Sequence, residues 1–253
     1  MHNKEIKEFN INSEKKFFKK FGYIKIDNFF DKKNVIKIKK FINSSIKDKN
    51  TFKYYEYNIN NTKEQLVRIE NFLKVDKELD NYLTKKLPLF LNKLLGDNWK
   101  LLKEKINFKP PLANKDKLHQ DVQAGWLKYS KKFVSVLISI NASNSKNANL
   151  HLDISGNNCQ TIKGEEFKTL KTNLLKKPKF KEFPLNSGDT LLFNGYIPHK
   201  SGVNKTKKPR IQVYLTYTSS KFINVRDKYY KDKLSNFPPN NFRKNKIIYK
   251  YLV

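Results

Sequence analysis

Downstream of Trp99 the sequence consists of short runs of β-branched and aromatic residues, which Pro, Gly, Asn and Ser interrupt. Such runs have the length and composition of β-strands. They cover residues 101–108, 133–140, 150–154, 190–193 and 211–218. Few helical segments lie between them. Strands at this spacing predict an antiparallel sandwich or barrel.

Residues 13–46 follow the pattern of a helix, a short strand and a second helix. Ser13 is expected to cap a first turn rich in phenylalanine, and Gly22 interrupts this turn before the strand. Asp31 is a good N-cap for the second helix, because its carboxylate can accept hydrogen bonds from free amides of the first turn. Apolar residues then recur at helical spacing. The chain is thus predicted to open with two amphipathic helices.

A second helical block covers residues 79–95, where leucines keep one face until Gly96. Gly96 is expected at the C′ position, because glycine readily adopts the left-handed conformation that ends many helices. Pro88 should kink this helix or divide it in two, since proline lacks an amide hydrogen. Residues 51–65 are polar, rich in Tyr and Asn and without clear periodicity, which predicts a loop that reaches over a cleft.

The length of 253 residues and the hydrophobic content of 38% suffice for one sizeable core. We therefore expect a single domain over 1–253, mainly β with a helical N-terminal region. Its parts would be helices over about 13–97, a β-core over about 99–220 and a tail over 221–253. Residues 157–183 are expected to form an exposed basic insertion between strands.

The formal net charge of +30 is extreme and suggests nucleic acid, an anionic membrane or an acidic small molecule as partner. However, the lysines are spread along the chain together with abundant Asn and Ile, as a compositional bias of the genome would place them. Arginine is scarce, although nucleic-acid readers prefer its planar fork. No zinc-finger, RNA-recognition or helix-turn-helix spacing is present. We expect no specific nucleic-acid partner, whereas a field of this sign favours an anionic substrate.

The chain contains no segment that approaches the roughly 20 apolar residues of a membrane span. Its N-terminus lacks the apolar stretch of a secretory signal. The lone Cys159 excludes an intrachain disulfide, which fits a reducing compartment, and we interpret this thiol as incidental. These features predict a soluble, cytoplasmic protein without a membrane partner.

Two short segments contain a set of candidate metal ligands. His119 and Asp121 stand two positions apart, so in an extended chain both side chains point to one face. His199 follows a predicted strand, and the competing histidines are His2 and His151. Two imidazoles and one carboxylate are the ligand set of non-haem Fe(II) oxygenases, which leave other positions open for a cosubstrate and O₂. An oxygenase is therefore the leading hypothesis.

Arg210 follows His199 at the start of an apolar run. Its guanidinium is a planar, permanently charged fork that holds a carboxylate in a bidentate manner. Ser201, two positions after His199, lies on the same face of an extended chain and can donate its hydroxyl to the same carboxylate. The alternative for Arg210 is a surface side chain after a turn. Together with the metal ligands, this spacing favours 2-oxoglutarate as the cosubstrate.

The segment His119-Gln-Asp, the block Asn186-Ser-Gly-Asp-Thr-Leu-Leu-Phe and the stretch from His199 to Arg210 resemble the phytanoyl-CoA dioxygenase family of Fe(II)/2-oxoglutarate oxygenases. The likeness extends over roughly residues 15–240. The resemblance implies a double-stranded β-helix, the cupin-like jelly roll, flanked by helices.

Within this family the sequence is most similar to bacterial enzymes of the 2-aminoethylphosphonate dioxygenase type. The segments that suggest this begin at Arg68, Lys103, His119 and Tyr229. The resemblance implies hydroxylation of a small organophosphonate, such as 2-aminoethylphosphonate or methylphosphonate, at the carbon next to phosphorus, with release of succinate and CO₂. A downstream partner would be an HD-domain oxygenase that cleaves hydroxylated phosphonates.

Carried over to this sequence, the resemblance implies that His119, Asp121 and His199 bind Fe(II). It implies that Arg210 and Ser201 hold the distal carboxylate of 2-oxoglutarate.

The same resemblance places Gln120 and Lys105 near the cosubstrate. A phosphonate dianion needs several cationic or amide donors. The candidates for substrate contact are Asn107, Lys109, Arg68, Gln123 and Trp126. In a chain so rich in lysine, the alternative is that lysines on this strand merely cover an exposed face.

Two functional alternatives remain. One is an oxygenase of the same family that acts on an acyl-CoA, an amino acid or a secondary metabolite. The other is a jelly roll without activity that binds a structural metal or polyanions. The aromatic and basic segment 226–231 either closes over the site or docks the C-terminus.

Overall fold

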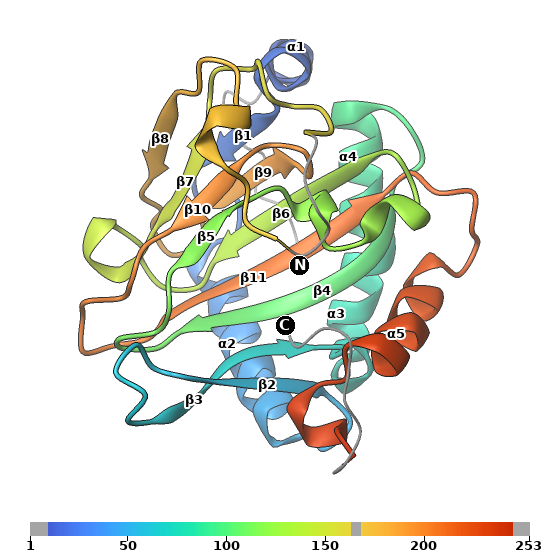
Figure 1. Ribbon diagram of the computed structural model, residues 1–253. Coiled ribbons are helices and arrows are strands. Elements are labelled where there is room, and N and C mark those ends of the chain that lie inside the picture. The colour runs from blue at the N-terminus through green and yellow to red at the C-terminus, as the bar shows by residue number, and fades with distance from the viewer. Residues whose placement is uncertain (1–9, 163–167, 245–253) are drawn as a thin grey trace.

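The computed structural model describes residues 10–162 and 168–244, which form two antiparallel sheets that face each other (Figure 1). In spatial order the large sheet contains β1 (Tyr23–Ile26), β9 (Thr190–Asn194), β6 (Phe133–Ser139), β11 (Arg210–Thr218), β4 (Lys100–Lys109), β3 (Glu64–Glu70) and β2 (Phe52–Tyr57). The small sheet contains β5 (Asp116–His119), β10 (His199–Ser201), β7 (Leu150–Asp153) and β8 (Phe180–Phe183). This arrangement is a jelly roll, which confirms the predicted fold class.

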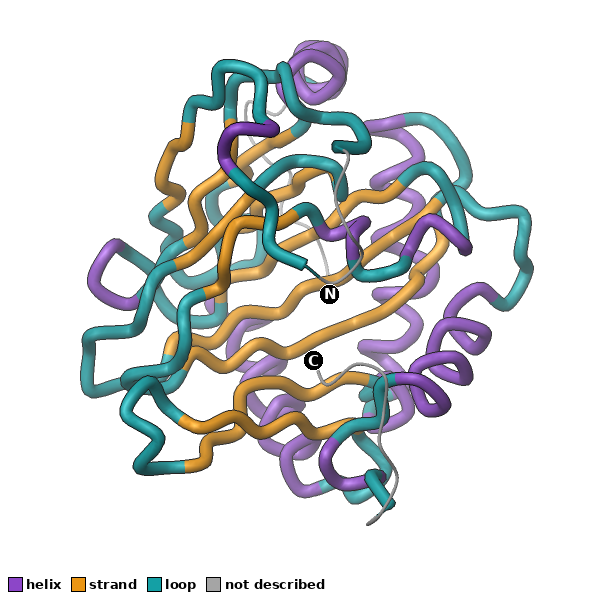
Figure 2. Tube along the Cα trace, viewed as in Figure 1, coloured by secondary structure: helices purple, strands orange, loops and turns teal. Residues whose placement is uncertain are grey.

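Helices pack on the outer face of the large sheet (Figure 2). The α-helices are α1 (Ile11–Phe21), α2 (Lys32–Lys47), α3 (Lys77–Asn81), α4 (Leu87–Leu95) and α5 (Val225–Asn236). Short 3₁₀ turns cover Leu73–Val75, Asp121–Gln123, Trp126–Lys128, Ser145–Asn147, Thr172–Leu174 and Asn240–Phe242. In Figure 1, α2, α3 and α4 lie behind the large sheet, on the side away from the small sheet.

The large sheet is buried on both faces. Outward-facing side chains such as Ile106, Val136 and Leu215 join the helices in one hydrophobic core. Inward-facing side chains such as Leu137 and Phe193 pack against the small sheet in another. Because both faces are covered, the central strand β6 is an unbroken run of buried residues, without the alternation of a half-exposed strand.

The opening helix, strand and helix are confirmed, as is the cap of α2. The Asp31 carboxylate accepts a hydrogen bond from the Asn34 amide at 2.8 Å. The prediction that Ser13 caps α1 is wrong. Asn10 is the cap, and its side chain accepts hydrogen bonds from the amides of Asn12 and Ser13. Asparagine caps as well as serine does, so the helix begins at the earlier of the two polar residues.

The second helical block is divided, as Pro88 predicted. A π-helical turn over Tyr82–Lys86 stands between α3 and α4, and Pro88 lies in the first turn of α4. Gly96 ends α4 with a positive φ of 74°.

The predicted loop over residues 51–65 is wrong, because most of this segment forms the β2–β3 hairpin at the edge of the large sheet. Phe52 and Tyr54 alternate along β2 and are buried, whereas the following residues of the strand are exposed. Because β2 is an edge strand, only a short part of it has to be apolar. Its polar residues therefore obscured the alternation of buried and exposed side chains in the sequence.

The segment 157–183 is more ordered than an exposed insertion. It contains β8, and Leu170 and Leu175 are buried. Asn158 is also buried, and its amide donates to the Asp153 carboxylate at 2.6 Å. Residues 163–167 lie outside the described part. The prediction of full exposure is therefore wrong, because isolated leucines in a lysine-rich stretch gave no periodic signal.

The C-terminal segment docks on the protein. Arg226 of α5 binds the buried Glu104 carboxylate through Nε at 2.9 Å. The Tyr230 hydroxyl donates to the Glu104 carbonyl at 3.1 Å and accepts from the Asn71 amide at 3.2 Å. These contacts agree with the docking alternative. The part of the predicted tail over 245–253 lies outside the described residues.

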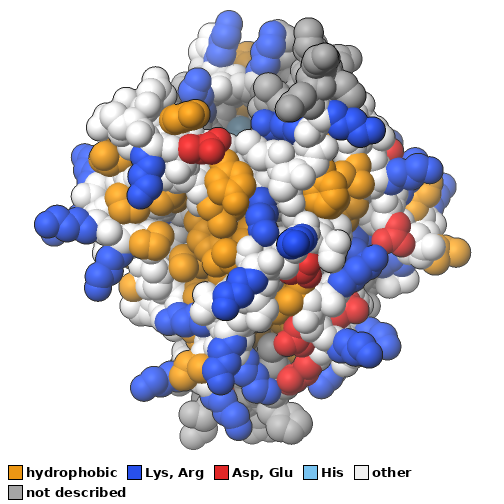
Figure 3. Space-filling view, turned by 90° about the horizontal axis from the view of Figure 1, so that it is seen from below, with side chains coloured by type: hydrophobic (Ala, Val, Ile, Leu, Met, Phe, Trp, Pro, Cys, Tyr) orange, Lys and Arg blue, Asp and Glu red, His pale blue; other side chains and the backbone are white. Residues whose placement is uncertain are grey.

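The described surface carries its basic residues in a scattered pattern. Figure 3 shows Lys and Arg side chains over much of the face seen from below, interspersed with hydrophobic and acidic ones. Within residues 10–162 and 168–244, no helix has both the length and the apolar character that crossing a membrane requires.

Candidate metal centre and binding cavity

The two histidines of the candidate centre meet because their strands pair. In the small sheet, β5 and β10 place His119 directly opposite His199, and their ring centroids lie 4.2 Å apart. Gln120 continues the extended chain with φ −108° and ψ 140°, and Asp121 begins a 3₁₀ turn. The ligand atoms of His119, Asp121 and His199 all lie within 4.8 Å of one another. One metal ion can contact all three, as the sequence predicted.

Hydrogen bonds orient each of these ligands. His119 Nδ1 lies 2.6 Å from the Lys117 carbonyl, and His199 Nδ1 lies 2.9 Å from the Ile197 carbonyl. Each Nδ1–H therefore donates to backbone, which leaves the Nε2 lone pair for a metal. The Ser135 hydroxyl donates to Asp121 Oδ2 at 2.8 Å. The other oxygen, Oδ1, lies 3.8 Å from His199 Nε2.

His199 and Asp121 are in the protonation state that a metal requires. Burial, followed by the nearby His119, lowers the pKa of His199 to about 4, so its imidazole is neutral at neutral pH. Burial alone would raise the pKa of Asp121, but His199, His119 and Lys103 outweigh this effect and lower it. Metal binding therefore does not have to displace protons from these two groups.

Of the competing histidines, His151 does not join this group. His151 lies on β7, and its Nε2 is 3.7 Å from Glu182 of the neighbouring strand. His2 lies outside the described residues. Among the residues that the structure describes, the set of His119, Asp121 and His199 is the one group of ligand atoms close enough to share an ion.

Arg210 lies on the inner face of β11 and is fully buried. Its Nη1 donates to the Ala148 carbonyl, whereas Nε and Nη2 have no hydrogen-bond partner. Leaving buried charged donors unpaired costs free energy, so a buried guanidinium with two free nitrogens lacks its anion. A carboxylate fits both free nitrogens. This observation supports the fit of 2-oxoglutarate to this end of the site.

Ser201 and Lys109 lie beside Arg210. Lys109 is paired with Arg210 in the β4–β11 ladder. Its buried Nζ lies 3.2 Å from Ser201 Oγ and 2.9 Å from the Asp116 carboxylate. The Ser201 hydroxyl donates to the same Asp116 oxygen. The structure thus places Lys109 beside Arg210 and Ser201.

A cavity of about 730 Å³ opens beside the metal ligands. Its walls come from β2, β3, β4, β5 and the segment that follows β5. The lining includes Tyr54, Glu56, Arg68, Lys103, Lys105, Asp116, His119, Asp121, Gln123, Trp126 and Arg243. Its charged groups are therefore mostly cationic, and His119 and Asp121 of the candidate metal set form part of its wall.

Several donors in this wall lack acceptors. Arg68 Nε, Gln123 Nε2 and Trp126 Nε1 are buried and have no hydrogen-bond partner. Lys103 and Lys105 form no hydrogen bond with the described residues. Their ammonium groups lie over the rings of Trp126 at 4.5 Å and Tyr214 at 4.6 Å. These five donors come from β3, β4 and the segment after Asp121, and together they form what we call the donor cluster.

Glu70 is the buried carboxylate beside the donor cluster. It is fully buried and lies 2.6 Å from Lys233 Nζ of α5 and 3.5 Å from Arg68 Nε. Burial alone would raise the Glu70 pKa, but Lys233, Arg68 and Lys103 lower it to about 2. Because one carboxylate faces several cations, the cluster keeps a net positive charge that an anionic ligand would neutralise.

The other predicted residues have different surroundings. The Gln120 amide donates to the carbonyls of Gln160 at 2.8 Å and Tyr196, so it anchors the neighbouring loops. Asn107 pairs in register with Arg68 on β3 and with Gln212 on β11.

Sequence reasoning missed Lys103, Ser135, Asp116 and Glu70 as parts of the site. Lys103 continues the two-residue alternation of Lys105 and Asn107, so extending that period would have found it. Glu70 follows Arg68 by the same two-residue period on β3, and Asp116 begins the strand that ends at His119. Ser135 comes from a distant segment and had no such signal.

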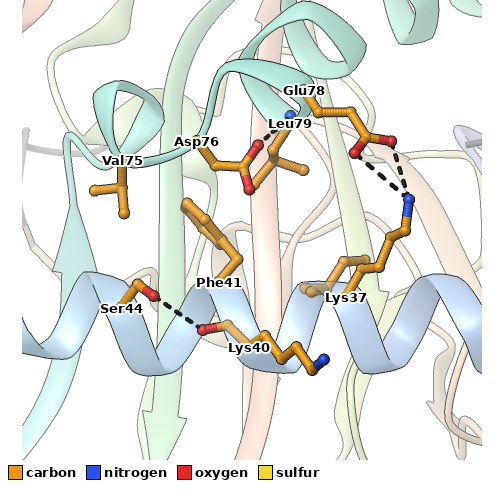
Figure 4. A pocket seen from close by; sticks show the side chains of 9 residues that line it. Lys37, Lys40, Phe41, Ser44, Val75, Asp76, Glu78 and Leu79 are labelled. Carbon is orange, nitrogen blue, oxygen red and sulfur yellow. Dashed lines mark hydrogen bonds and ion pairs between the residues drawn. The ribbon is translucent and has the colours of Figure 1, made fainter.

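A second, smaller hollow of about 230 Å³ lies on the outer side, between α2 and the start of α3 (Figure 4). Lys37 reaches across it to Glu78 at 3.2 Å, and Asp76 caps α3 through the Leu79 amide at 2.9 Å. Lys37 and Glu78 thus pair with each other across this hollow.

Comparison with known proteins places these features in context. The sequence model of the family described as phytanoyl-CoA dioxygenase (PhyH) matches residues 18–212. A 2-aminoethylphosphonate dioxygenase of Uncultured bacterium HF130_AEPn_1 is 31% identical over 188 residues, which are 74% of this chain and 72% of that protein. A methylphosphonate hydroxylase of Gimesia maris is 28% identical over 233 residues, which are 85% of this chain and 84% of that one.

Among solved structures, EctD from S. alaskensis with 2-oxoglutarate and 5-hydroxyectoine has a TM-score of 0.68 and an identity of 17%. The match covers 82% of this chain and 75% of that one. At this identity the likeness shows a shared fold.

Proposed function

Because the chain belongs to the phytanoyl-CoA dioxygenase family of Fe(II)- and 2-oxoglutarate-dependent oxygenases, we propose that it hydroxylates a small organophosphonate at the carbon next to phosphorus. Methylphosphonate and 2-aminoethylphosphonate are the reference substrates, since similar proteins carry their names. The observation that supports this proposal is the donor cluster, a set of cationic and amide donors without acceptors, in the same cavity as the metal ligands.

His119, Asp121 and His199 would hold Fe(II), and Arg210 would hold the distal carboxylate of 2-oxoglutarate together with Ser201. The chemistry that bound Fe(II) supplies in this family is oxidation by O₂, in which 2-oxoglutarate becomes succinate and CO₂ and one oxygen atom enters a substrate C–H bond. The protein contributes binding, orientation and the exclusion of water. No side chain has to act as a general base.

The donor cluster would bind the phosphonate oxygens. A phosphonate dianion offers several acceptor oxygens around one phosphorus atom, and charge-assisted hydrogen bonds to them are strong. Lys103 and Lys105 would supply charge, and the indole N–H of Trp126 and the amide of Gln123 would fix the orientation. Because these donors and the metal ligands line one cavity, a phosphonate bound here presents its neighbouring carbon on the metal side.

Replacing Lys105 with Met should raise the KM for the phosphonate about 10- to 100-fold, because a hydrogen bond to a charged group contributes about 1.5–3 kcal/mol. The KM for 2-oxoglutarate should change much less. Initial rates of succinate formation measure both constants. Lys181→Met is the matched control, since this lysine is exposed on β8 and lies over Phe183. An unchanged phosphonate KM in Lys105→Met would contradict the assignment.

The pH dependence should report the same lysine. Burial, followed by the positive charges of Lys103 and Arg68, lowers the pKa of Lys105 to about 8. Its ammonium is therefore present below about pH 8 and lost as the pH rises through that value. Because kcat/KM reports ionisations of the free enzyme, kcat/KM for the phosphonate should fall above about pH 8. The Lys105→Met profile should lack this fall, and a wild-type profile that stays flat to about pH 9.5 would contradict the prediction.

A substrate panel tests the proposal as a whole. Succinate formation should rise with methylphosphonate or 2-aminoethylphosphonate and remain near the uncoupled level with acyl-CoA thioesters and free amino acids. The product would be a 1-hydroxyphosphonate, the kind of compound that an HD-domain oxygenase cleaves. Stimulation by an acyl-CoA or an amino acid alone would replace the phosphonate with another substrate of the same family.

A further inference from the structure

The Ser201 hydroxyl, which would hold the distal carboxylate together with Arg210, already binds a carboxylate of the protein. Asp116 accepts hydrogen bonds from the Ser201 hydroxyl and from Lys109 Nζ. We propose that Asp116 competes internally with the distal carboxylate of 2-oxoglutarate for the Ser201 hydroxyl. This inference rests on the assignment of Arg210 and Ser201 in the proposed function.

The sheet register brings the four groups together. Ser201 pairs with Asp116 between β10 and β5, and Arg210 pairs with Lys109 between β11 and β4. The two sheets thus each contribute one adjacent pair, and the pairs meet through the hydrogen bond of 3.2 Å between Lys109 Nζ and Ser201 Oγ.

Burial determines which of these groups can leave. Arg210, Lys109 and Ser201 are 0%, 3% and 4% exposed, so the donors are enclosed by the fold. The Asp116 side chain is 42% exposed. It can turn toward solvent and be hydrated there, which the donors cannot do. An incoming carboxylate can therefore replace the protein's own one.

The charges agree with an exchange of partners. In the ligand-free protein two cations, Arg210 and Lys109, face one anion, Asp116, and Arg210 keeps two nitrogens unpaired. Asp116 satisfies Lys109 but not Arg210. The distal carboxylate would satisfy Arg210 and take the Ser201 hydroxyl, leaving Asp116 to Lys109 alone.

The competition has a kinetic consequence. Succinate keeps the distal carboxylate of 2-oxoglutarate, so it would be held by the same donors after turnover. An internal carboxylate that returns to Ser201 weakens the binding of both molecules. Asp116 would thereby favour release of succinate and exchange for the next cosubstrate.

The test measures binding of 2-oxoglutarate to the full chain with Mn(II) in place of Fe(II) and without O₂, so that no turnover occurs. Asp116→Ala should lower the Kd for 2-oxoglutarate about three- to tenfold, the worth of one hydrogen-bond exchange. Asp116→Asn removes only the charge and should give a smaller gain. The Tm of both variants without ligand should fall, because Lys109 loses its partner, whereas the shift in Tm on adding 2-oxoglutarate should grow.

Glu56→Gln is the matched control. Glu56 is exposed at the rim of the same cavity, so the change alters the cavity charge equally without touching Ser201. An equal gain in Glu56→Gln, or an unchanged or higher Kd in Asp116→Ala, would overturn the inference. Asp116→Asn decides the question if the alanine variant does not fold. If Arg210→Met binds 2-oxoglutarate with the Kd of the wild type, the assignment of Arg210 as the carboxylate anchor is wrong. If Arg210→Met loses 2-oxoglutarate binding while Asp116→Ala does not lower the Kd, the Arg210 assignment stands and only the competition by Asp116 is refuted.

Discussion

Asp121→Ala should lower succinate formation by about 100-fold or more, since even the outer partners of metal ligands contribute about 10- to 100-fold. Asp121 is the single carboxylate of the candidate ligand set, and its Oδ1 lies 3.8 Å from His199 Nε2. Without it two neutral imidazoles remain, which hold a hard Fe(II) ion weakly. The loss should appear as a loss of metal binding, not only of turnover.

Equilibrium dialysis with Fe(II) under anaerobic conditions measures that binding directly. Asp227→Asn is a suitable control, because its side chain is 79% exposed on α5 and forms only a long contact of 4.0 Å with Arg226. This control should bind metal as the wild type does. Full Fe(II) affinity in Asp121→Ala would mean that the ion lies elsewhere.

Arg210→Met should raise the KM for 2-oxoglutarate about 100-fold, because a bidentate contact with a carboxylate contributes about 3 kcal/mol. The metal affinity should be unchanged, since Arg210 contacts no ligand of the metal set. The methionine retains most of the apolar stem. Removing a buried cation with two unpaired nitrogens should not lower the Tm of the ligand-free protein, and can raise it.

Steady-state kinetics with varied 2-oxoglutarate and a thermal melt together check this prediction. Arg243→Met is the control, because Arg243 lines the cavity but comes from the segment that follows α5. A KM that rises equally in both variants would indicate a general loss of positive charge. A rise confined to Arg210→Met supports a specific anchor.

The metal ligands could be predicted because their signal is local. His119 and Asp121 are two residues apart, and His199 and Ser201 share one short strand. For His199 and Ser201 the shared face follows from the strand period. His119 and Asp121 share a side because Gln120 between them is extended. The Asp31 cap of α2, the interruption near Pro88 and the strand-rich core are local in the same sense.

Other parts depend on pairing between distant segments. Lys109 alternates with Lys105 along β4, which suggested a common role, but β4 is long enough to reach two different environments. Lys109 contacts Asp116 of β5 and Ser201 of β10. The sequence of β4 alone does not show how these two strands lie beside it. The buried Glu70 and its partner Lys233 are likewise far apart in sequence.

The hairpin over 52–70 was hidden for a different reason. Its first strand lies at the edge of the sheet, so only Phe52 and Tyr54 are buried and the remaining residues are exposed. A pattern this short resembles a loop. In the structure Tyr54 of the first strand packs against Arg68 of the second, whose guanidinium carbon lies 4.2 Å from the ring centroid.

The most direct measurement is ³¹P NMR of the complete reaction, with methylphosphonate or 2-aminoethylphosphonate, 2-oxoglutarate, Fe(II) and O₂. The account predicts that the substrate resonance is replaced by that of a 1-hydroxyphosphonate, with one succinate formed for each phosphonate consumed. Succinate formation that leaves both phosphonates unchanged would contradict the account, because the donor cluster would then serve a different anion.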